Sequence, residues 1–386
     1  TCRDEPVGSY LVKHPAINLI MTTGATDTCR LFMKLKPDVR LFGETGGKNC
    51  GIVTALADRD LAVKEIVQSA FGYSGQKCSA MSLIILDEEV YQDRKFLYQL
   101  VDATASLPCG SAWDFDTKIN PLIRPPSDKL KRALMTLEDG EEWLLKPSIQ
   151  KHNPQLITPG IKRGVQRGSF THQTEFFGPI LGIMCAKDLD DAITTANMTS
   201  YGLTSGLFSL DSREHSIWKA KIHAGNCYIN RTITGAIVKR QPFGGCKASN
   251  FGLGMKAGGE NYLLQLLDSF AGDFIDNQKY IQYVEHNFKR SLSLLPQRED
   301  KGYFVQAVSS YIYWMEHHFS KTLEQDKVFG EDNFLNYHPH DHIFFYVQES
   351  DSIIDCLLVL AAAKISGCAI TVGGKKKGMA TIPDAR

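Results

Sequence analysis

Short apolar runs alternate with amphipathic segments through most of this chain, and this rhythm constrains its fold more than any other feature. Ala16–Thr22 predicts a strand, Thr26–Lys36 a helix, and Val39–Gly43 a second strand. The same pattern continues with strands over Gly51–Ala55, Ser82–Asp87, Leu181–Ala186, Gly206–Leu210 and Cys227–Ile229, and helices over Asp60–Phe71, Asp188–Asn197 and Arg213–Ile222. Strands that alternate with helices in this way predict βαβ units and a mainly parallel sheet.

The last third of the chain follows a different pattern. Residues 242–260 are rich in glycine and predict an irregular segment, and Asn277–Leu294 and Tyr303–Thr322 predict two amphipathic helices around a polar linker at 296–302. His342–Gln348, Ser352–Ser366 and Ala369–Val372 then predict a strand, a helix and a strand, followed by a polar tail. This arrangement favours a separate C-terminal α/β module.

Composition narrows the function classes. Lys plus Arg and Asp plus Glu are 43 each among 386 residues, so no net positive field favours nucleic acid. Apolar runs such as Cys356–Ala363 are too short to span a membrane. Ten cysteines without a CxxC pair argue against a zinc site or a disulfide framework and favour the cytoplasm. The chain starts with Thr1, so we expect it to begin inside a longer polypeptide.

One cysteine has a distinctive setting. GYSGQKCSA at 72–80 places Cys78 between a glycine-rich turn and an apolar strand. A nucleophilic thiolate needs open approach and a lowered pKa, to which the neighbouring Lys77 would contribute. Taken alone, a single cysteine is more often a small buried hydrophobic residue.

Two further segments carry acids. ETGGKN at 44–49 sets Glu44 at a strand end before two glycines, where burial would raise its pKa into the range of a general base. HQTEFFGPIL at 172–181 sets Glu175 and two phenylalanines before a Gly-Pro turn and a strand. Taken alone, the segment at 44–49 would be interpreted as a solvated turn, and the segment at 172–181 as the start of a strand packed by phenylalanine. HPHDH at 338–342 is interpreted as a polar turn rather than a metal site.

In this order, and joined by AGNCYIN at 224–230 and PFGG at 242–245, the three segments resemble the aldehyde dehydrogenase superfamily. A finer resemblance is to the Δ1-pyrroline-5-carboxylate (L-glutamate γ-semialdehyde) dehydrogenase region of bacterial proline utilisation A. It is carried by GQKCSA, NPLIRPP, TEFFGPILGIM, YGLTSGLFSLDSRE and RTITGAIVKRQPFGG, and it covers about residues 1–270. NFLNYHPHDHIFFYVQE at 333–349 resembles the C-terminal aldehyde-dehydrogenase-like domain of the longer members.

The resemblance implies an aldehyde dehydrogenase-like α/β fold, with a parallel-sheet Rossmann-type nucleotide-binding part, an α/β catalytic domain and a further C-terminal α/β module. Residues 1–47 would be the C-terminal part of the NAD-binding domain and 48–250 the catalytic thiol domain. Residues 251–310 would form a return or oligomerisation segment and linker, and 311–386 the C-terminal module, complete or in part.

The resemblance also implies the chemistry. Cys78 would attack an aldehyde to give a thiohemiacetal, hydride would pass to NAD to leave a thioester, and Glu44 would activate the hydrolysing water. Glu175 would hold the nicotinamide ribose, with Phe177 beside the nicotinamide.

The turn at Gly24 and Ala25 would contact the pyrophosphate at a helix N-terminus, where free N–H groups suit an anion. Members of the family carry an oxyanion-hole asparagine and an adenine-ribose lysine far upstream of this turn, and neither has a counterpart in this sequence. We therefore expect the isolated chain to be inactive or nearly so.

Substrate recognition follows from the same resemblance. Ser79, Gly235 and Ala236 would bind the substrate carboxylate through bare backbone N–H groups, and Phe243 would wall its aliphatic stem. This predicts NAD-dependent oxidation of L-glutamate γ-semialdehyde to L-glutamate in proline catabolism, by a homo-oligomer fused to, or supplied by, a proline dehydrogenase. The alternatives are another semialdehyde as substrate, an inactive fragment that serves in assembly, and, for the C-terminal module, an assembly or lid role.

Overall fold

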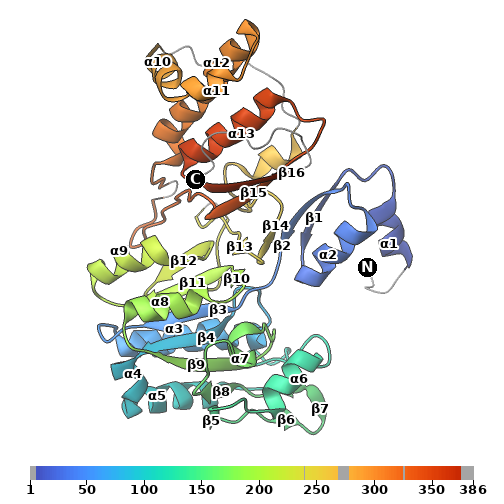
Figure 1. The fold of residues 1–386 in the computed structure, drawn as a ribbon. Helices are drawn as coiled ribbons and strands as arrows, with labels where there is room; N and C mark the ends of the chain where they lie inside the picture. Colours follow the sequence, from blue (N-terminus) through green and yellow to red (C-terminus); the bar gives the residue numbers. More distant parts are fainter. Residues whose placement is uncertain (1–5, 239, 268–277, 325–326, 375–386) are drawn as a thin grey trace. The chain divides into compact units, whose positions relative to one another are not determined.

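The computed structural model describes residues 6–238, 240–267, 278–324 and 327–374 (Figure 1). The chain forms two compact units, residues 1–266 and residues 267–386. Among the described residues, every helix is too short or too polar to span a bilayer. The predicted division at residues 47, 250 and 310 stays a prediction.

The first unit begins with a small sheet that carries one end of the site. β1 (Leu19–Thr23) and β2 (Arg40–Glu44) are parallel and are joined by α2 (Thr26–Leu35), as the sequence predicted, and α1 (Pro6–Lys13) precedes them. β1 starts three residues later than expected because Ile17 N–H closes a turn onto the carbonyl of His14. The third strand, β14 (Asn250–Phe251), pairs antiparallel with β2 and comes from the predicted irregular segment.

A seven-stranded sheet forms the body of this unit. Its strands lie in the order β12 (Asn226–Ile229), β11 (Thr204–Phe208), β3 (Asn49–Val53), β4 (Met81–Asp87), β9 (Ile180–Ala186), β8 (Gly160–Arg163) and β5 (Glu142–Leu145). Every pairing is parallel except that of β5 with β8. The predicted parallel α/β sheet is therefore confirmed, while β8 and β5 were not predicted.

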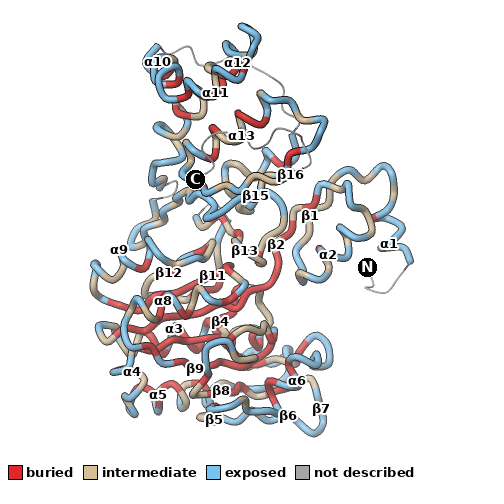
Figure 2. The backbone as a smooth tube through the Cα atoms, viewed as in Figure 1, coloured by how far each residue is buried: buried red, intermediate tan, exposed pale blue. Residues whose placement is uncertain are grey.

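Helices cover both faces of this sheet. α3 (Arg59–Phe71) and α5 (Arg94–Ala105) pack with Ile84 and Leu86 on one face. α8 (Leu189–Asn197) and α9 (Ser212–Lys221) pack with Leu83 and Ile85 on the other. Because both faces are covered, most residues of the central strands are apolar and buried (Figure 2).

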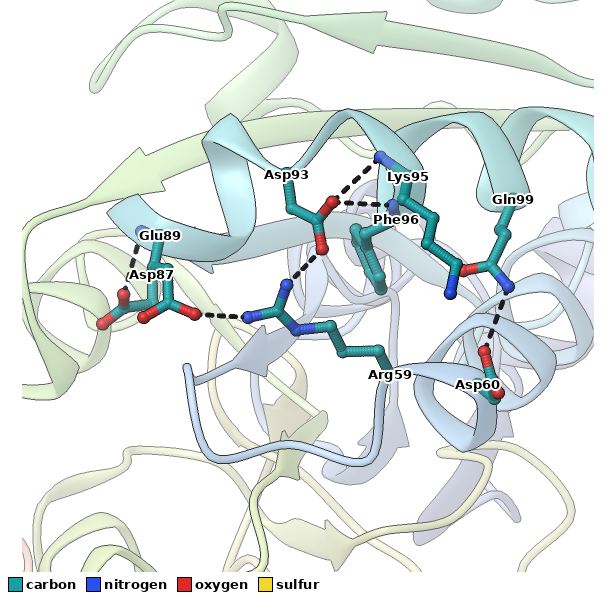
Figure 3. A network of polar contacts seen from close by, with 8 residues as sticks. All are labelled: Arg59, Asp60, Asp87, Glu89, Asp93, Lys95, Phe96 and Gln99. Atoms are coloured by element: carbon teal, nitrogen blue, oxygen red, sulfur yellow. Dashed lines mark hydrogen bonds and ion pairs between the residues drawn. The ribbon is translucent and has the colours of Figure 1, made fainter.

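A polar network fixes the helix starts at the outer end of β4 (Figure 3). Asp93 caps α5 by accepting from the N–H groups of Lys95, at 2.9 Å, and Phe96, at 3.3 Å, and it also binds the guanidinium of Arg59. Arg59 lies at the start of α3 and reaches Glu89 of α4 (Glu88–Gln92) at 2.6 Å. The network ties three helix termini together.

Several shorter elements escaped the sequence pattern. They are α6 (Asp128–Met135), α7 (Phe170–Gln173), the hairpin of β6 (Ile149–Gln150) and β7 (Asn153–Ile157), the pair β10 (Tyr201–Gly202) and β13 (Cys246–Lys247), and the short helices η1 (Gly72–Gly75) and η2 (Tyr262–Leu266).

The second unit contains α10 (Gln278–Asn287), α11 (Lys289–Ser293), α12 (Arg298–Trp314), η3 (Met315–Phe319), β15 (His342–Val347), α13 (Ile353–Ser366) and β16 (Ala369–Gly374). β15 and β16 are parallel, so the predicted strand–helix–strand is confirmed. The predicted linker at 296–302 is wrong from Arg298 onward, because α12 starts there after an extended Gln297, with Glu299 and Asp300 in its first turn. The tail at 375–386 lies outside the described residues.

Candidate active site

The carboxylate of Glu44 lies at the end of β2, against a loop from much later in the chain. Its Oε2 accepts a hydrogen bond from Gly245 N–H at 3.2 Å, and its backbone carbonyl accepts one from Gly24 N–H at 3.0 Å. Burial raises the pKa of Glu44 to about 7, although the Gly245 N–H and the nearby Lys256 ammonium act to lower it. A carboxyl with this pKa exchanges a proton readily near neutral pH, as a general base must.

A second carboxylate, Glu175, rests on the two glycines that follow Glu44. Its Oε1 accepts from Gly47 N–H at 2.9 Å. A Cβ on Gly46 would stand 2.2 Å from the other carboxylate oxygen, so only glycine allows this approach. Burial raises the pKa of Glu175, while the Gly47 N–H and the charges of Lys48 and Lys129 lower it.

Cys78 follows a strained turn that brings its loop against the Glu175 segment. Tyr73 and Ser74 adopt left-handed φ values of 55° and 56°, and Gly75 has φ 69°. A Cβ on Gly75 would stand 2.4 Å from the carbonyl oxygen of Gly178, three residues after Glu175. The two predicted motifs therefore contact each other backbone to backbone.

The thiol of Cys78 is half-buried and shares its surroundings with both acids. Its pKa is raised, first by burial and further by the charges of Glu175 and Glu44, against the lowering effect of the Ser79 N–H. The suggestion that Lys77 lowers this pKa is wrong, because its ammonium lies 4.3 Å from the centre of the Tyr73 ring and is not among the causes of the shift. The resting thiol keeps its proton and needs a neighbouring base.

Asn49 is a site residue that sequence reasoning missed. Its side-chain amide donates to the carbonyls of Cys78, at 2.7 Å, and Ala80, at 2.9 Å, and its Oδ1 accepts from Thr204 N–H at 3.0 Å. The signal was available, since a buried polar residue at the start of an apolar strand must find partners. Asn49 holds the carbonyl side of the nucleophile loop.

Lys48 is the second missed residue. It is 3% exposed, and its ammonium has no hydrogen-bond partner among the described residues. The Nζ atom lies 4.3 Å from the centre of the Phe176 ring. Burial lowers the pKa of Lys48 to about 7, against the attraction of Glu175.

The four predicted substrate residues differ in how closely the structure links them to this centre. Ser79 is buried, and its carbonyl accepts from Thr204 Oγ1 at 3.3 Å. Phe243 exchanges backbone hydrogen bonds of 2.9 and 2.8 Å with Ala257, directly before the glycines that face Glu44. Gly235 is exposed with φ 84°, and Ala236 is half-buried. Within the part of the chain that the structure describes, neither Gly235 nor Ala236 forms a hydrogen bond with Cys78.

The predicted cofactor turn borders Glu44. Gly24 is tied to the Glu44 carbonyl, and Ala25 is the exposed N-cap of α2, where no side chain caps the helix. Phe177 is 44% exposed and adopts φ 55°, two residues after Glu175. In the described parts of the chain, no cluster of three or more potential metal ligands occurs.

Several known proteins are similar to this chain. The family model described as "Aldehyde dehydrogenase family" matches residues 1–269. The chain belongs to the aldehyde dehydrogenase family. A 1-pyrroline-5-carboxylate dehydrogenase of Bacillus subtilis is 36% identical over 267 residues, which are 67% of this chain and 51% of that protein. The chain thus spans about half the length of the curated relatives it matches.

Two solved structures are also similar. Proline utilization A from Corynebacterium freiburgense is 38% identical with a TM-score of 0.84, and the match covers 97% of this chain and 37% of that one. A 1-pyrroline-5-carboxylate dehydrogenase from Thermus with bound NAD is 34% identical with a TM-score of 0.62, covering 68% of this chain and 52% of that one. The first match extends across both units of this aldehyde dehydrogenase chain.

Proposed function

We propose that this chain carries the catalytic centre for the NAD-dependent oxidation of L-glutamate γ-semialdehyde, the open form of Δ1-pyrroline-5-carboxylate, to L-glutamate. One observation carries the proposal. Gly47 and Asn49, a few residues after Glu44, hold the Glu175 carboxylate and the Cys78 carbonyl, respectively. A nucleophile, a base and a cofactor-binding acid thus converge on one six-residue loop. The similarity to 1-pyrroline-5-carboxylate dehydrogenases supports the choice of substrate.

The pKa values suggest how the two catalytic groups cooperate. Because the raised pKa of Cys78 keeps its proton in place, Glu44, with a pKa of about 7, is the group that takes this proton as sulfur bonds to the aldehyde carbon. The carbonyl oxygen then carries the charge, and the backbone N–H of Cys78 would donate to it. After oxidation, Glu44 releases the thiol proton to solvent and takes a proton from water as the water oxygen bonds to the thioester carbon. The carbon–sulfur bond then breaks to release the acid, and Glu44 returns its proton to the leaving sulfur to restore the thiol.

The residues present fit a nicotinamide dinucleotide. The uncapped N-terminus of α2 after Gly24 and Ala25 offers N–H groups to a pyrophosphate. Glu175 lies close enough to Cys78 to raise the pKa of the thiol, as expected of the acid that holds the nicotinamide ribose, and the exposed Phe177 ring would pack beside the nicotinamide. NAD, when bound, would supply the hydride acceptor.

The substrate carboxylate is the finer part of the proposal. Gly235 is exposed with left-handed φ, and no atom lies within 4 Å of where a Cβ would stand. With Ala236 it has a small side chain that leaves the backbone N–H open to a carboxylate, and the buried Ser79 would complete the site from its place beside Cys78. Phe243, beside the glycines that face Glu44, would pack on the aliphatic stem.

Turnover of two aldehydes tests both the catalytic roles of Cys78 and Glu44 and the proposed site for the substrate carboxylate. With NAD, we expect a full-length protein that contains this chain to oxidise glutamate semialdehyde at least tenfold faster than propanal, as kcat/KM, since a hydrogen-bonded carboxylate contributes discrimination that a methyl group cannot. Cys78→Ser and Glu44→Gln should abolish both reactions, and Cys109→Ser, at an exposed thiol, should abolish neither. Equal rates for the two aldehydes would contradict the carboxylate site and leave another aldehyde as substrate. The expected inactivity of the isolated chain stays a prediction that the same assay tests.

The proposal also covers the source of the substrate, the oligomeric state and the cellular compartment. Its similarity to proline utilization A supports a proline dehydrogenase, fused or separate, as the source of substrate, and a homo-oligomeric state is proposed with it. All nine cysteines that the structure describes are free thiols, as expected in the cytoplasm.

A further inference from the structure

Lys256 lies in the glycine-rich segment beyond the predicted motifs, and its ammonium is turned toward the loop that contacts Glu44. Nζ donates to the carbonyls of Gly225 at 2.5 Å and Gly244 at 2.7 Å, and to Asn226 Oδ1 at 3.4 Å. Gly225 directly precedes β12 and Asn226 is its first residue, whereas Gly244 lies in the PFGG turn. The lysine therefore joins the sheet to the turn.

The turn is anchored to the sheet by further contacts on the same side. Asn226 accepts from Gly244 N–H at 3.1 Å and donates to the Pro242 carbonyl at 3.0 Å. A Cβ on Gly225 would stand 1.9 Å from the Gly244 oxygen, so the backbones are in direct contact. These contacts leave the turn little freedom.

A single peptide group connects the ammonium to the catalytic carboxylate. The Gly244 carbonyl that accepts from Lys256 and the Gly245 N–H that donates to Glu44 at 3.2 Å belong to the same peptide unit. An ammonium at the oxygen polarises the peptide and makes its N–H a stronger donor, because hydrogen bonds in series reinforce one another. The Lys256 ammonium thus strengthens the hydrogen bond to Glu44 through a single peptide group.

We propose that Lys256 is a positioning residue for Glu44, which it acts on through the Gly244–Gly245 peptide group. This inference rests on the proposed role of Glu44 as the base. By fixing the turn, Lys256 keeps the Gly245 N–H directed at the carboxylate, and by polarising the peptide it favours the ionised form of that carboxylate.

The electrostatics of the neighbouring groups agree with this role. Lys256 lowers the pKa of Glu44, whereas the charge of Glu44 raises the pKa of Cys78 and of Tyr262. Burial lowers the pKa of Lys256 itself, against the opposing effects of Cys227, Glu44 and Cys246. Among these groups, Lys256 is the one that stabilises the Glu44 carboxylate by its charge.

The test follows hydrolysis of an acyl group on Cys78 without any cofactor. The full chain is acetylated with p-nitrophenyl acetate, the reagent is removed, and loss of the acetyl group from the Cys78 peptide is followed by mass spectrometry between pH 5.5 and 9. In the unmodified protein the rate should rise with an apparent pKa of about 7, that of Glu44. In Lys256→Met, the apparent pKa should shift upward by about one unit and the plateau rate should fall roughly tenfold.

Matched variants separate this role from general loop stability. Lys247→Met is the control, since Lys247 lies in the same loop and donates to the carbonyls of Asn197 at 2.8 Å and Thr199 at 3.1 Å, neither of which contacts Glu44. It should keep the apparent pKa of the unmodified protein. Lys256→Arg should keep the pKa and lower only the plateau. Should Lys256→Met fail to fold, Lys256→Gln, which removes the charge and keeps a donor, carries the same expected pKa shift.

An unchanged pH profile in a folded Lys256→Met or Lys256→Gln protein would overturn the inference, as would an equal shift in Lys247→Met. Two other results would instead contradict the proposed function itself. One is that Cys78 takes up no acetyl group, and the other is that the Glu44→Gln variant hydrolyses the acetyl group as fast as the unmodified protein does.

Discussion

The side-chain amide of Asn49 lies 2.7 Å from the backbone carbonyl oxygen of Cys78 and donates a hydrogen bond to it. Asn49→Ala removes this bond and leaves Thr204 N–H buried without its acceptor, so we expect the free energy of unfolding to fall by about 3 kcal/mol. The loosened loop should also expose the half-buried thiol. Urea unfolding measures the first effect, and the rate of iodoacetamide labelling of the Cys78 peptide, expected to rise several-fold, measures the second. Asn287→Ala, at an exposed amide bonded only to the Tyr283 carbonyl, should alter neither.

The turn before the nucleophile offers a matched pair of glycines. Gly75 has φ 69° and no room for a Cβ beside the Gly178 carbonyl, whereas a Cβ on Gly72 would have no atom within 4 Å, and its φ is −54°. Gly75→Ala should therefore lower the free energy of unfolding by about 2 kcal/mol or more and slow acylation of Cys78. Gly72→Ala should be neutral within about 0.5 kcal/mol. Similar values for the two variants, measured by urea unfolding, would contradict the tight contact between the Cys78 and Glu175 segments.

The buried ammonium of Lys48 makes stability depend on pH. Its pKa is lowered to about 7 from an ordinary value of 10.5, so between these values the unfolded chain binds the proton more tightly and the native protein gains stability as pH rises. Lys48→Met removes this titration and keeps the packing on Phe176. Its melting temperature should exceed that of the unmodified protein by a few degrees at pH 6, and the difference should shrink toward pH 10. A constant difference across this range would contradict a buried, unpartnered ammonium.

Glu44 should show the opposite dependence. Its pKa is raised from 4.5 to about 7, so the native protein binds the proton more tightly and loses stability as pH rises across that window. Glu44→Gln does not titrate and can still accept from Gly245 N–H. We expect its melting temperature, relative to the unmodified protein, to rise between pH 4.5 and 7 and to level off above pH 7. Glu142→Gln, at an exposed carboxylate, should show no such trend.

The sequence predicted the central fold well because its strands are buried on both faces. β3, β4, β9 and β11 appear as mainly apolar runs separated by helical segments, so the position and type of these strands could both be inferred. The antiparallel β5 at the sheet edge has only half-buried or exposed residues and gave no such signal. The predicted linker before α12 failed because a run of charged residues describes the first turn of a helix as well as it describes a loop.

The site was predictable where residues have a recognisable chemical pattern and not where they act through contacts across the fold. Cys78, Glu44 and Glu175 stand in motifs that the family resemblance singles out. Asn49 and Lys256 have roles set by backbone carbonyls 29 and 12 residues away, which no local pattern shows. The partners of Asn49 become visible only when the Cys78 loop is placed in space, and those of Lys256 only when β12 and the PFGG turn are.

The bond between Glu44 and Gly245 joins residues 201 positions apart, and β14 closes on β2 from beyond that point. Contacts of such long range form late in folding, because the intervening chain must first be ordered. During synthesis, therefore, the carboxylate of Glu44 stays in contact with water until the segment that carries Gly245 and β14 has been translated. Only then does burial raise its pKa, so the last segment of this unit to be made is the one that turns an ordinary glutamate into a base.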